Sequence, residues 1–457
     1  MSQIIQNPPI AAIATPVGEG GIAVIRVSGK EAISTVNKAF NGRDLTKQDS
    51  HTVHFGKIND SNGLPVDEVL VTLFRSPKSY TGEETVEISC HGGVLVTQKV
   101  LETVLALGVR SAVAGEFTQR AFLNGKLDLD QAEAVADLIH AKSIKAVDAA
   151  HQQLEGRLGE HVKRFRQQII DATAMVELEL DFIEEDVEFA NKEQLQKLLE
   201  DVDSELLNLL ETYETGRLVK DGVKTVLIGR PNAGKSTLLN TLVGSDRAIV
   251  TEIAGTTRDT IDVDWNFDGL LFKLIDTAGL RETEDIVEAE GVKRSQKAFE
   301  QADLVIYLKD TSRPFSNEER SEIADFQKRS GETPFILIGT KADIEADEEW
   351  RIQFDLKISA VGGKKIDELK KLLKDRALEN KHYDASSLLV TSSRHRDALQ
   401  KSREQIQAAL NGLAQGMTGD FLSVDLRSAL NELGTITGEI TNEHILDSIF
   451  SRFCIGK

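Results

Sequence analysis

The sequence predicts a protein with α/β and all-α parts: an N-terminal α/β domain, a helical domain, and a second α/β domain with a mainly parallel sheet inserted into the helical one. Three observations predict this organisation. Short β-like runs alternate with turns to about residue 126, strands alternate with helices between residue 220 and about residue 378, and helical patterns flank that second stretch. A chain of 457 residues is long enough for several such domains.

The composition excludes several classes of protein. The chain carries 54 Lys and Arg against 74 Asp and Glu, a net charge of −20, so we do not expect it to grip nucleic acid along its whole length. If RNA is a partner, one local face or another protein must supply the positive charge. Two cysteines, Cys90 and Cys454, cannot build a disulfide framework or a Cys-rich zinc site. Without a signal-like start or a run of 18 apolar residues, we expect a soluble, cytoplasmic protein with no membrane partner.

Residues 1–126 are predicted to form the N-terminal α/β domain. Apolar, β-branched runs predict strands at residues 21–27, 69–74 and 85–89, and a helical pattern follows at residues 94–107. Two charged residues, Arg26 and Glu87, interrupt these strands. The simplest interpretation is that the two charges lie on edge strands and face water.

Residues 127–219 and 379–457 are predicted to form the helical domain. No proline lies between Ser79 and Arg230 or after Pro334, so long helices are permitted in both flanks. In the first flank, apolar residues recur three and four positions apart, which indicates a face packed against a core or another helix. These residues are Leu195, Leu198, Leu199, Val202, Leu206, Leu207 and Leu210.

The second flank ends with the same helical spacing, preceded by Thr441 or Asn442 as a cap. Its apolar residues are Ile445, Leu446, Ile449, Phe450 and Phe453. Because helical sequence stands on both sides of residues 220–378, we expect this stretch to be inserted between flanks that pack together. The acidic residues between 181 and 188 have no His or Cys beside them, and a solvated helix end explains them more simply than a metal site.

The most specific motif in the chain lies at residues 223–236. The apolar run 223–228 predicts a buried strand, and the following GRPNAGKS fits G-x-x-x-x-G-K-[ST] throughout. The glycines allow backbone amides to curl around phosphate oxygens, and the next helix presents its positive N-terminus to them. We expect Lys235 to reach the β- and γ-phosphates and the Ser236 hydroxyl to bind Mg²⁺.

Three further motifs follow predicted strands, in the order that GTPases show. The D-x-x-G sequence begins at Asp276, which supports the Mg²⁺ shell, and ends at Gly279, whose amide senses the γ-phosphate. TKAD at residues 340–343 is a variant of N-K-x-D, and Asp343 can accept both N–H groups of the guanine edge. Ser359-Ala360 fits the loop that contacts guanine O6. These motifs predict a GTP site beyond the strands' carboxyl ends. Thr340 in place of Asn leaves open how firmly the base loop is braced.

The hydrolytic apparatus departs from the Ras-like pattern. Where Ras-like enzymes position the attacking water with Gln, this chain has Leu280, which cannot hydrogen-bond to water through its side chain. A substitute must therefore come from another segment. The candidates are residues 251–259 (TEIAGTTRD) and the acidic residues 282–290.

Taken together, the motifs resemble one family. GRPNAGKS, AIVTEIAGTTRD, DTAGLRET, FTQRAFLNGKLDLDQAEA and the terminal FCIGK are similar to the MnmE (TrmE) tRNA-modification GTPases. The similarity runs from GGIAVIRVSG near the N-terminus to Lys457. The first two motifs also fit Era-like GTPases, whereas AFLNGKLD and the Cys-Ile-Gly-Lys end are far more specific. The resemblance implies an N-terminal folate-binding domain that dimerises, a helical domain and an inserted Ras-like P-loop G domain.

The resemblance also implies an activity, that of a GTP hydrolase in tRNA modification. In this family the homodimer joins the FAD-dependent MnmG protein in a heterotetramer. Together they build a carboxymethylaminomethyl or aminomethyl group on C5 of the tRNA wobble uridine. The one-carbon unit comes from 5-formyl- or methylene-tetrahydrofolate, and the tRNA is held mainly by the partner. Potassium-promoted pairing of G domains, rather than an arginine from another protein, activates hydrolysis.

By position, the resemblance assigns site residues. The nucleotide contacts are Asn232, Ala233, Gly234, Lys235, Ser236, Thr237, Thr251, Thr256, Thr257, Asp276, Thr277, Ala278, Gly279, Thr340, Lys341, Asp343, Ser359 and Ala360. The K⁺ ligands are Asn232, Thr251, Ile253 and Thr256, and Thr257 joins Ser236 on Mg²⁺. Glu288 aligns with the family's water-positioning glutamate better than Glu282 does, which resolves the Leu280 problem.

The resemblance also revises the interpretation of the N-terminal charges. The folate contacts it implies are Arg26, Glu87, Lys126 and the terminal Lys457. Cys454 matches the family's terminal cysteine, for which a thiolate beside a lysine suggests a catalytic, electrophile-trapping role; a role in packing remains open. Cys90 is expected to be a buried small residue.

Two other interpretations stay open. In the first, the chain is an Era-like RNA-binding switch in ribosome assembly that uses GTP hydrolysis as a timer; a basic C-terminal domain would favour it, but this chain ends in an amphipathic helix and Cys-Ile-Gly-Lys. In the second, the helical regions form a dimer scaffold and the G domain is idle.

Overall fold

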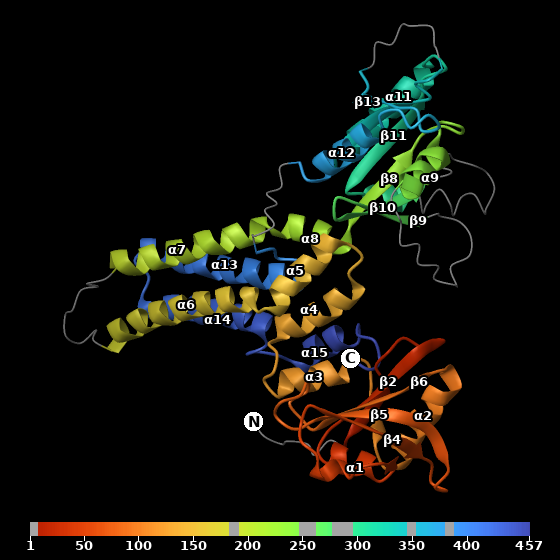
Figure 1. Ribbon diagram of the computed structural model, residues 1–457. Helices are drawn as coiled ribbons and strands as arrows, with labels where there is room; N and C mark the ends of the chain where they lie inside the picture. Colours follow the sequence, from red (N-terminus) through yellow and green to blue (C-terminus); the bar gives the residue numbers. More distant parts are fainter. Residues whose placement is uncertain (1–7, 182–191, 246–261, 277–295, 345–352, 380–387) are drawn as a thin grey trace, which may run out of the picture. The chain divides into compact units, whose positions relative to one another are not determined.

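The structure, a computed structural model, describes residues 8–181, 192–245, 262–276, 296–344, 353–379 and 388–457 (Figure 1). Its contacts divide the chain into two compact units. The first contains residues 1–139, 153–202 and 404–457, and the second contains residues 140–152 and 203–403. Both segments of the second unit are therefore flanked in sequence by segments of the first.

The first unit is built on a seven-stranded sheet with the order β3-β4-β5-β6-β2-β1-β7. Neighbouring strands are antiparallel except β1 and β7. The strands are β1 (Ile10–Ile13), β2 (Gly20–Ser28), β3 (Phe40–Asn41), β4 (Thr52–Asn59), β5 (Pro65–Phe74), β6 (Thr85–Gly92) and β7 (Arg110–Ser111). All three strands expected from the sequence are confirmed.

One face of this sheet is buried and the other is partly open. Helices α1 (Ala32–Asn37) and α2 (Val94–Ala106), with the short helix η1 (Leu45–Lys47), accompany a core that includes Ile25, Val71 and Ile88. Because side chains alternate along each strand, the other face presents Val53, Phe55 and Leu70, all exposed.

The structure corrects the edge-strand interpretation of Arg26 and Glu87. Strands β2 and β6 are neighbours inside the sheet, where Arg26 lies directly opposite Glu87. Their side chains are 15% and 28% exposed, because each pairs with the other instead of facing water. Residue pattern alone could not place the two strands side by side.

The helical part follows the predicted pattern. Its helices are α3 (Glu116–Leu123), α4 (Leu129–His140), α5 (Ile144–Leu154), α6 (Arg157–Asp181), α7 (Lys192–Glu211), α8 (Tyr213–Asp221), α13 (Ser393–Ala414), α14 (Gly419–Thr437) and α15 (Glu443–Phe450). Along α7, the predicted stripe is buried at Leu195, Leu199, Val202 and Leu206.

The two helical flanks pack together within the first unit, as expected. Helix α6 lies beside α14 (Figure 1), and Arg166 on α6 forms an ion pair with Glu439 at 2.8 Å. Asn442 caps α15, because its side-chain oxygen accepts from the Ile445 amide at 2.9 Å. Ile449 and Phe450 of that helix share a buried cluster with Leu129 of α4. Residues 182–188 of the predicted acidic cluster lie outside the described residues.

The second unit contains a six-stranded sheet with the order β13-β12-β11-β8-β10-β9. Every neighbouring pair is parallel except β9 and β10, so the predicted mainly parallel sheet is confirmed. The strands are β8 (Val223–Ile228), β9 (Asp262–Phe267), β10 (Leu270–Asp276), β11 (Leu304–Asp310), β12 (Phe335–Thr340) and β13 (Leu356–Lys357).

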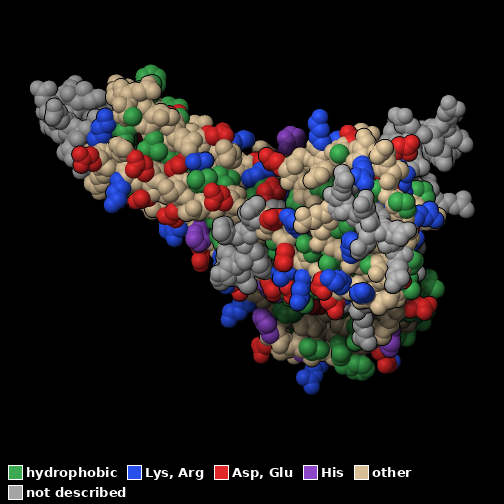
Figure 2. Space-filling view, turned by 90° about the horizontal axis from the view of Figure 1, so that it is seen from above, with side chains coloured by type: hydrophobic (Ala, Val, Ile, Leu, Met, Phe, Trp, Pro, Cys, Tyr) green, Lys and Arg blue, Asp and Glu red, His purple; other side chains and the backbone are tan. Residues whose placement is uncertain are grey.

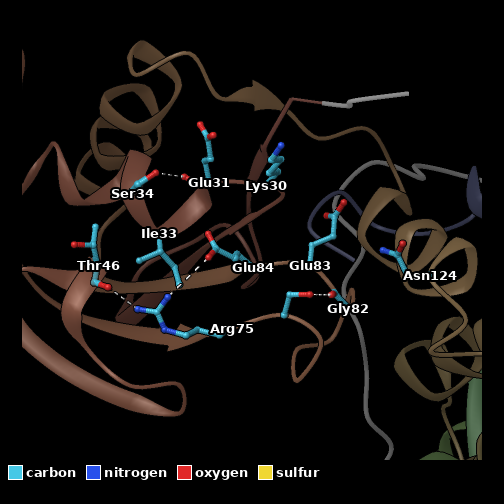
Figure 3. A pocket seen from close by; sticks show the side chains of 11 residues that line it. Lys30, Glu31, Ile33, Ser34, Thr46, Arg75, Gly82, Glu83, Glu84 and Asn124 are labelled. Atoms are coloured by element: carbon cyan, nitrogen blue, oxygen red, sulfur yellow. Dashed lines mark hydrogen bonds and ion pairs between the residues drawn. The ribbon is translucent and has the colours of Figure 1, made fainter. Parts of the chain in front are cut away.

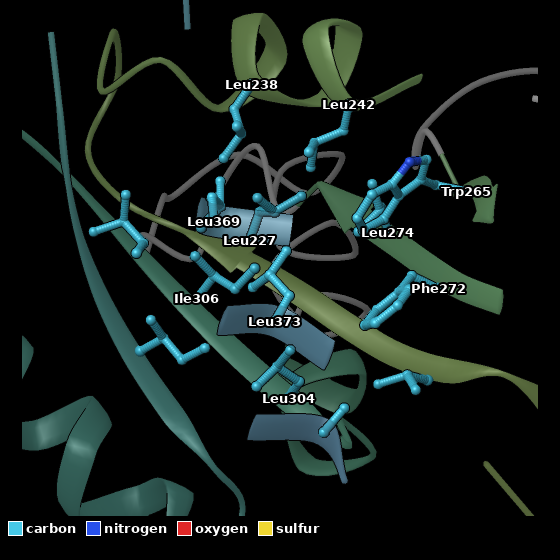
Figure 4. Packing of buried hydrophobic residues seen from close by; sticks show 14 of the residues in the cluster. Leu227, Leu238, Leu242, Trp265, Phe272, Leu274, Leu304, Ile306, Leu369 and Leu373 are labelled. Atoms are coloured by element: carbon cyan, nitrogen blue, oxygen red, sulfur yellow. The ribbon is translucent and has the colours of Figure 1, made fainter. Parts of the chain in front are cut away.

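Helices cover both faces of this sheet, which explains why its central strands are mainly apolar. Helices α9 (Lys235–Ser245) and α12 (Ile366–Ala377) contribute Leu238 and Leu369 to one core, where they join Trp265 (Figure 4). Helix α11 (Asn317–Ser330) contributes Phe326 to the core on the opposite face, which includes Tyr307 of β11. Both cores hold the carboxyl ends of β8, β11 and β12 in register, and the predicted site lies there.

The described residues can be characterised by the charge of their surface and the apolar character of their helices. On the face seen in Figure 2, acidic and basic side chains of the described residues are intermixed. Among the helices that the structure describes, none combines the length and apolar character needed to cross a membrane.

Candidate functional site

The phosphate loop follows β8, as the motif predicts. Gly229 has φ of 151°, and a Cβ there would lie 2.4 Å from the Leu308 oxygen, so only glycine fits. Gly234 also has a positive φ, 92°, and Asn232 has φ of 64°, a left-handed conformation that Asn tolerates better than most residues. Helix α9 starts directly after this turn and directs its first amides toward the loop.

The side chains of the loop differ in their surroundings. The Lys235 ammonium donates to the Gly229 oxygen at 2.7 Å and approaches the Arg230 oxygen at 3.4 Å. Ala233 is buried, whereas Asn232, Ser236 and Thr237 are exposed. The loop can therefore surround an anion with amide groups, with a lysine ammonium at its mouth.

The base loop is braced by the residue that departs from the usual Asn. The buried Thr340 hydroxyl lies 2.7 Å from the Ala233 oxygen in the phosphate loop and 3.1 Å from the Lys309 oxygen at the end of β11. The Thr311 hydroxyl in turn donates to the Thr340 oxygen at 2.7 Å. Thr340 thus links the base loop to the phosphate loop with a hydroxyl where other GTPases use an amide.

Two carboxylates beside the base loop have lowered pKa values. Burial raises the pKa of Asp310, but hydrogen bonds from Lys341, at 2.6 Å, and from Ser312 outweigh it, so the net shift is downward. A hydrogen bond from Ser359 is the main reason why the pKa of the exposed Asp343 is lowered. Asp343 is therefore a carboxylate that accepts a hydrogen bond from Ser359.

The oxygen of Ala360, the second residue of the predicted O6 loop, accepts from the Thr241 hydroxyl of α9 at 3.3 Å. The structure therefore brings the phosphate loop, TKAD and the Ser359-Ala360 loop to one edge of the sheet. Asp276 ends β10 at the same edge, opposite Leu227 of β8. The remaining predicted residues lie outside the described residues: Thr251, Ile253, Thr256, Thr257, Thr277, Ala278, Gly279, Leu280, Glu282 and Glu288.

A second polar cluster forms in the N-terminal domain. The Arg26 guanidinium binds Glu87 at 2.9 Å and lies over the rings of Tyr80 and Phe117, with its Cζ 5.3 and 5.7 Å from their centres. Burial, and then the charge of Arg26, lower the pKa of Lys457, while Glu87 and Cys454 act in the opposite direction. Arg26 and Glu87, two of the four predicted folate residues, are thus paired.

The remaining N-terminal candidates have other surroundings. Lys126 donates to the Pro77 oxygen at 3.3 Å. Cys454 is exposed, while Cys90 is buried, as expected for a small core residue. Burial is also the main reason why the pKa of the Cys90 thiol is raised.

Another hollow in this domain, about 550 Å³ in volume, contains none of the predicted folate residues (Figure 3). Some of the charged side chains that line it contact one another. Arg75 donates to the Thr46 oxygen at 2.8 Å and lies 3.9 Å from Glu84. Glu83, also in the lining, binds Arg120 at 3.1 Å. The predicted folate contacts therefore lie elsewhere.

Sequence reasoning missed the residues that support the nucleotide loops. Lys309 and Asp310 end an otherwise apolar strand, and Glu319 lies in the first turn of α11. A lysine and an aspartate at the end of a buried strand could have indicated these supporting residues, because charged side chains are rarely buried without a partner. In the N-terminal domain, Tyr80 and Phe117 beneath Arg26 gave no comparable signal.

Two family models together match almost the whole chain. The family model for the GTP-binding protein TrmE N-terminus matches residues 9–126, and that for the MnmE helical domain matches residues 129–454. The tRNA modification GTPase MnmE of Salinibacter ruber is 48% identical over 99% of this chain and 100% of its own length. The protein of the same name from Bacillus cytotoxicus is 43% identical over 98% of this chain and 99% of its own. Among solved structures, Era of Aquifex aeolicus matches 40% of this chain and 65% of its own, with 23% identity and a TM-score of 0.29. The identity and coverage of the two MnmE relatives show that the chain belongs to the MnmE family of tRNA modification GTPases.

Proposed function

We propose that this chain is a potassium-activated GTPase that works with an MnmG-type, FAD-dependent partner to modify C5 of the tRNA wobble uridine in the cytoplasm. The observation that carries the proposal is the shared sheet edge at which the phosphate loop and the Thr340–Asp343 base loop are joined through one buried hydroxyl. A site built this way combines phosphate binding with guanine selection. The proposed role in tRNA modification is supported by similarity to tRNA modification GTPases over almost the full length of the chain.

The proposed roles in the nucleotide site follow from residue chemistry. Lys235 neutralises the β- and γ-phosphates, and Asp343 selects guanine through its carboxylate. Ser236 and Thr257 would hold Mg²⁺, which offsets charge on the phosphates when bound. Glu288 would orient the attacking water in place of the missing glutamine.

Asn232 would bind K⁺ together with Thr251, Ile253 and Thr256. Its exposed position in the left-handed turn of the phosphate loop suits that role, because its side-chain oxygen is open to an ion from solvent. A monovalent cation there would neutralise developing charge as an arginine does in other GTPases.

We further propose that the N-terminal domain, residues 1–126, binds a tetrahydrofolate derivative and forms the homodimer. Arg26, Glu87 and Lys457 offer paired charges next to aromatic rings, a suitable surface for a pterin and a carboxylated tail. The exposed Phe55, Leu70 and Val53 on the open sheet face suit burial against a second copy. The helical domain would be residues 127–219 and 379–457, and the G domain residues 220–378.

Nucleoside analysis of tRNA tests the proposal. Cells lacking this protein should lose the C5 modification of the wobble uridine, the intact gene should restore it, and the Glu288→Ala variant should not. Normal modification in the deletion strain would instead favour an Era-like RNA-binding switch. The match of the helical family model over residues 129–454 argues against that alternative.

A further inference from the structure

We propose that Glu319 on α11 is a positioning residue for the phosphate loop and controls how fast guanine nucleotide leaves the site. This inference rests on the proposed placement of the nucleotide at residues 229–236. Glu319 belongs to none of the GTPase motifs in the sequence. It acts through Arg230, the second residue of the loop.

The first step of the argument is the burial of Glu319. Its carboxylate lies 3.1 Å from the Lys309 ammonium, and the two side chains are only 7% and 3% exposed. A buried ion pair of this kind is costly to break, because removal of one partner leaves the other charge without compensation. The backbone of Glu319 is also fixed, since its amide donates to Ser316, the N-cap of α11, at 3.1 Å.

The second step is the contact with the loop. The other carboxylate oxygen of Glu319 lies 3.8 Å from the Arg230 guanidinium. Glu322 and Glu318 on the same helix approach that guanidinium at 3.4 and 3.7 Å. Of the three carboxylates, Glu319 is the most buried, and it is therefore the one least screened by water.

The third step links Arg230 to the phosphates. The backbone oxygens of Gly229 and Arg230 receive the Lys235 ammonium, so the position of Arg230 sets where that ammonium sits. Lys309, the buried partner of Glu319, also lends its backbone oxygen to Thr340 of the base loop. Glu319 thus links the helix to the phosphate loop through Arg230 and to the base loop through Lys309.

The test is the release rate of a fluorescent GDP analogue from the full-length protein. In Glu319→Gln, we expect release to be about five to ten times faster and KM for GTP to rise, with kcat within about twofold, because weaker holding of the loop removes uniform binding. Glu318→Gln is the matched control: its side chain is 87% exposed, and its release rate should not change.

Two further variants separate positioning from a loss of stability. In the background of Arg230→Met, adding Glu319→Gln should change release by less than about twofold, because the two side chains act as one unit. The double variant Lys309→Met with Glu319→Gln removes the buried lysine charge together with its carboxylate partner, and release of the analogue should stay fast.

The inference is overturned if Glu319→Gln only lowers the melting temperature, if its effect simply multiplies that of Arg230→Met, or if Lys309→Met with Glu319→Gln releases the analogue at the wild-type rate. A different result would show that the nucleotide does not bind at residues 229–236: Lys235→Ala would then bind the analogue as tightly as the wild type.

Discussion

Replacing Thr340 by Val removes one hydroxyl and almost no volume, so it tests the brace between the two nucleotide loops directly. Thr340, Ala233 and Lys309 are 2%, 3% and 3% exposed, so water cannot replace the lost donor. A buried carbonyl left without a partner costs about 1–3 kcal/mol, and we expect the free energy of unfolding of the G domain to fall by that amount. If the loss is about 1.4 kcal/mol larger in the GDP-bound protein than in the free protein, the dissociation constant for GDP rises about tenfold.

Urea unfolding and titration with a fluorescent GDP analogue measure the two effects. Thr340→Ser is the matched control, because it keeps the hydroxyl and loses the methyl group; its GDP affinity should stay within about threefold of the wild type. Equal GDP affinity and equal stability of Thr340→Val and the wild type would refute the brace. So would a Thr340→Ser variant that is as weak as Thr340→Val.

Four further predictions concern the remaining sites. GTP turnover should be several times faster in K⁺ than in Na⁺, and equal rates in both salts would contradict the proposed cation site. Glu288→Ala should abolish GTP turnover while GDP binding persists. The pKa of Asp310 is lowered by its bond to Lys341, so its contribution to stability is full above the ordinary value of 3.8 and is lost as pH falls through the lower folded-state pKa. Asp310→Asn should therefore lose less stability than the wild type between pH 6 and pH 3 in urea unfolding, and an unchanged pH dependence would count against that linkage. Phe55→Asp, on the open sheet face, should shift the protein from dimer to monomer in sedimentation, whereas Val361→Asp, at a position 88% exposed in the other unit, should not; a dimer that survives Phe55→Asp must use another face.

The nucleotide loops were predictable because their chemistry is local. The spacing in GRPNAGKS places two glycines and a lysine within one turn and a helix start, and the structure has that turn with Gly229 and Gly234 at positive φ. Helical periodicity likewise predicted the buried stripe of α7 and the Asn442 cap of α15. In each case the residues that determine the structure are a few positions apart in the chain.

Pairings between distant segments were not predictable in the same way. Arg26 and Glu87 looked like edge charges until strand order placed β2 beside β6. Thr340 looked like a weakened motif until its hydroxyl was found on the Ala233 oxygen, 107 positions away.

The sequence by itself determined the family, the two α/β domains, the helical flanks and the guanine-nucleotide motifs, because backbone conformation and apolar periodicity are properties of neighbouring residues. Only the tertiary structure decided which buried charges meet. Lys309, Glu319 and Arg230 come from a strand, a helix and a loop, and no spacing rule connects them. A charge taken out of water needs a partner in space, and the folded chain, not the local sequence, chooses that partner.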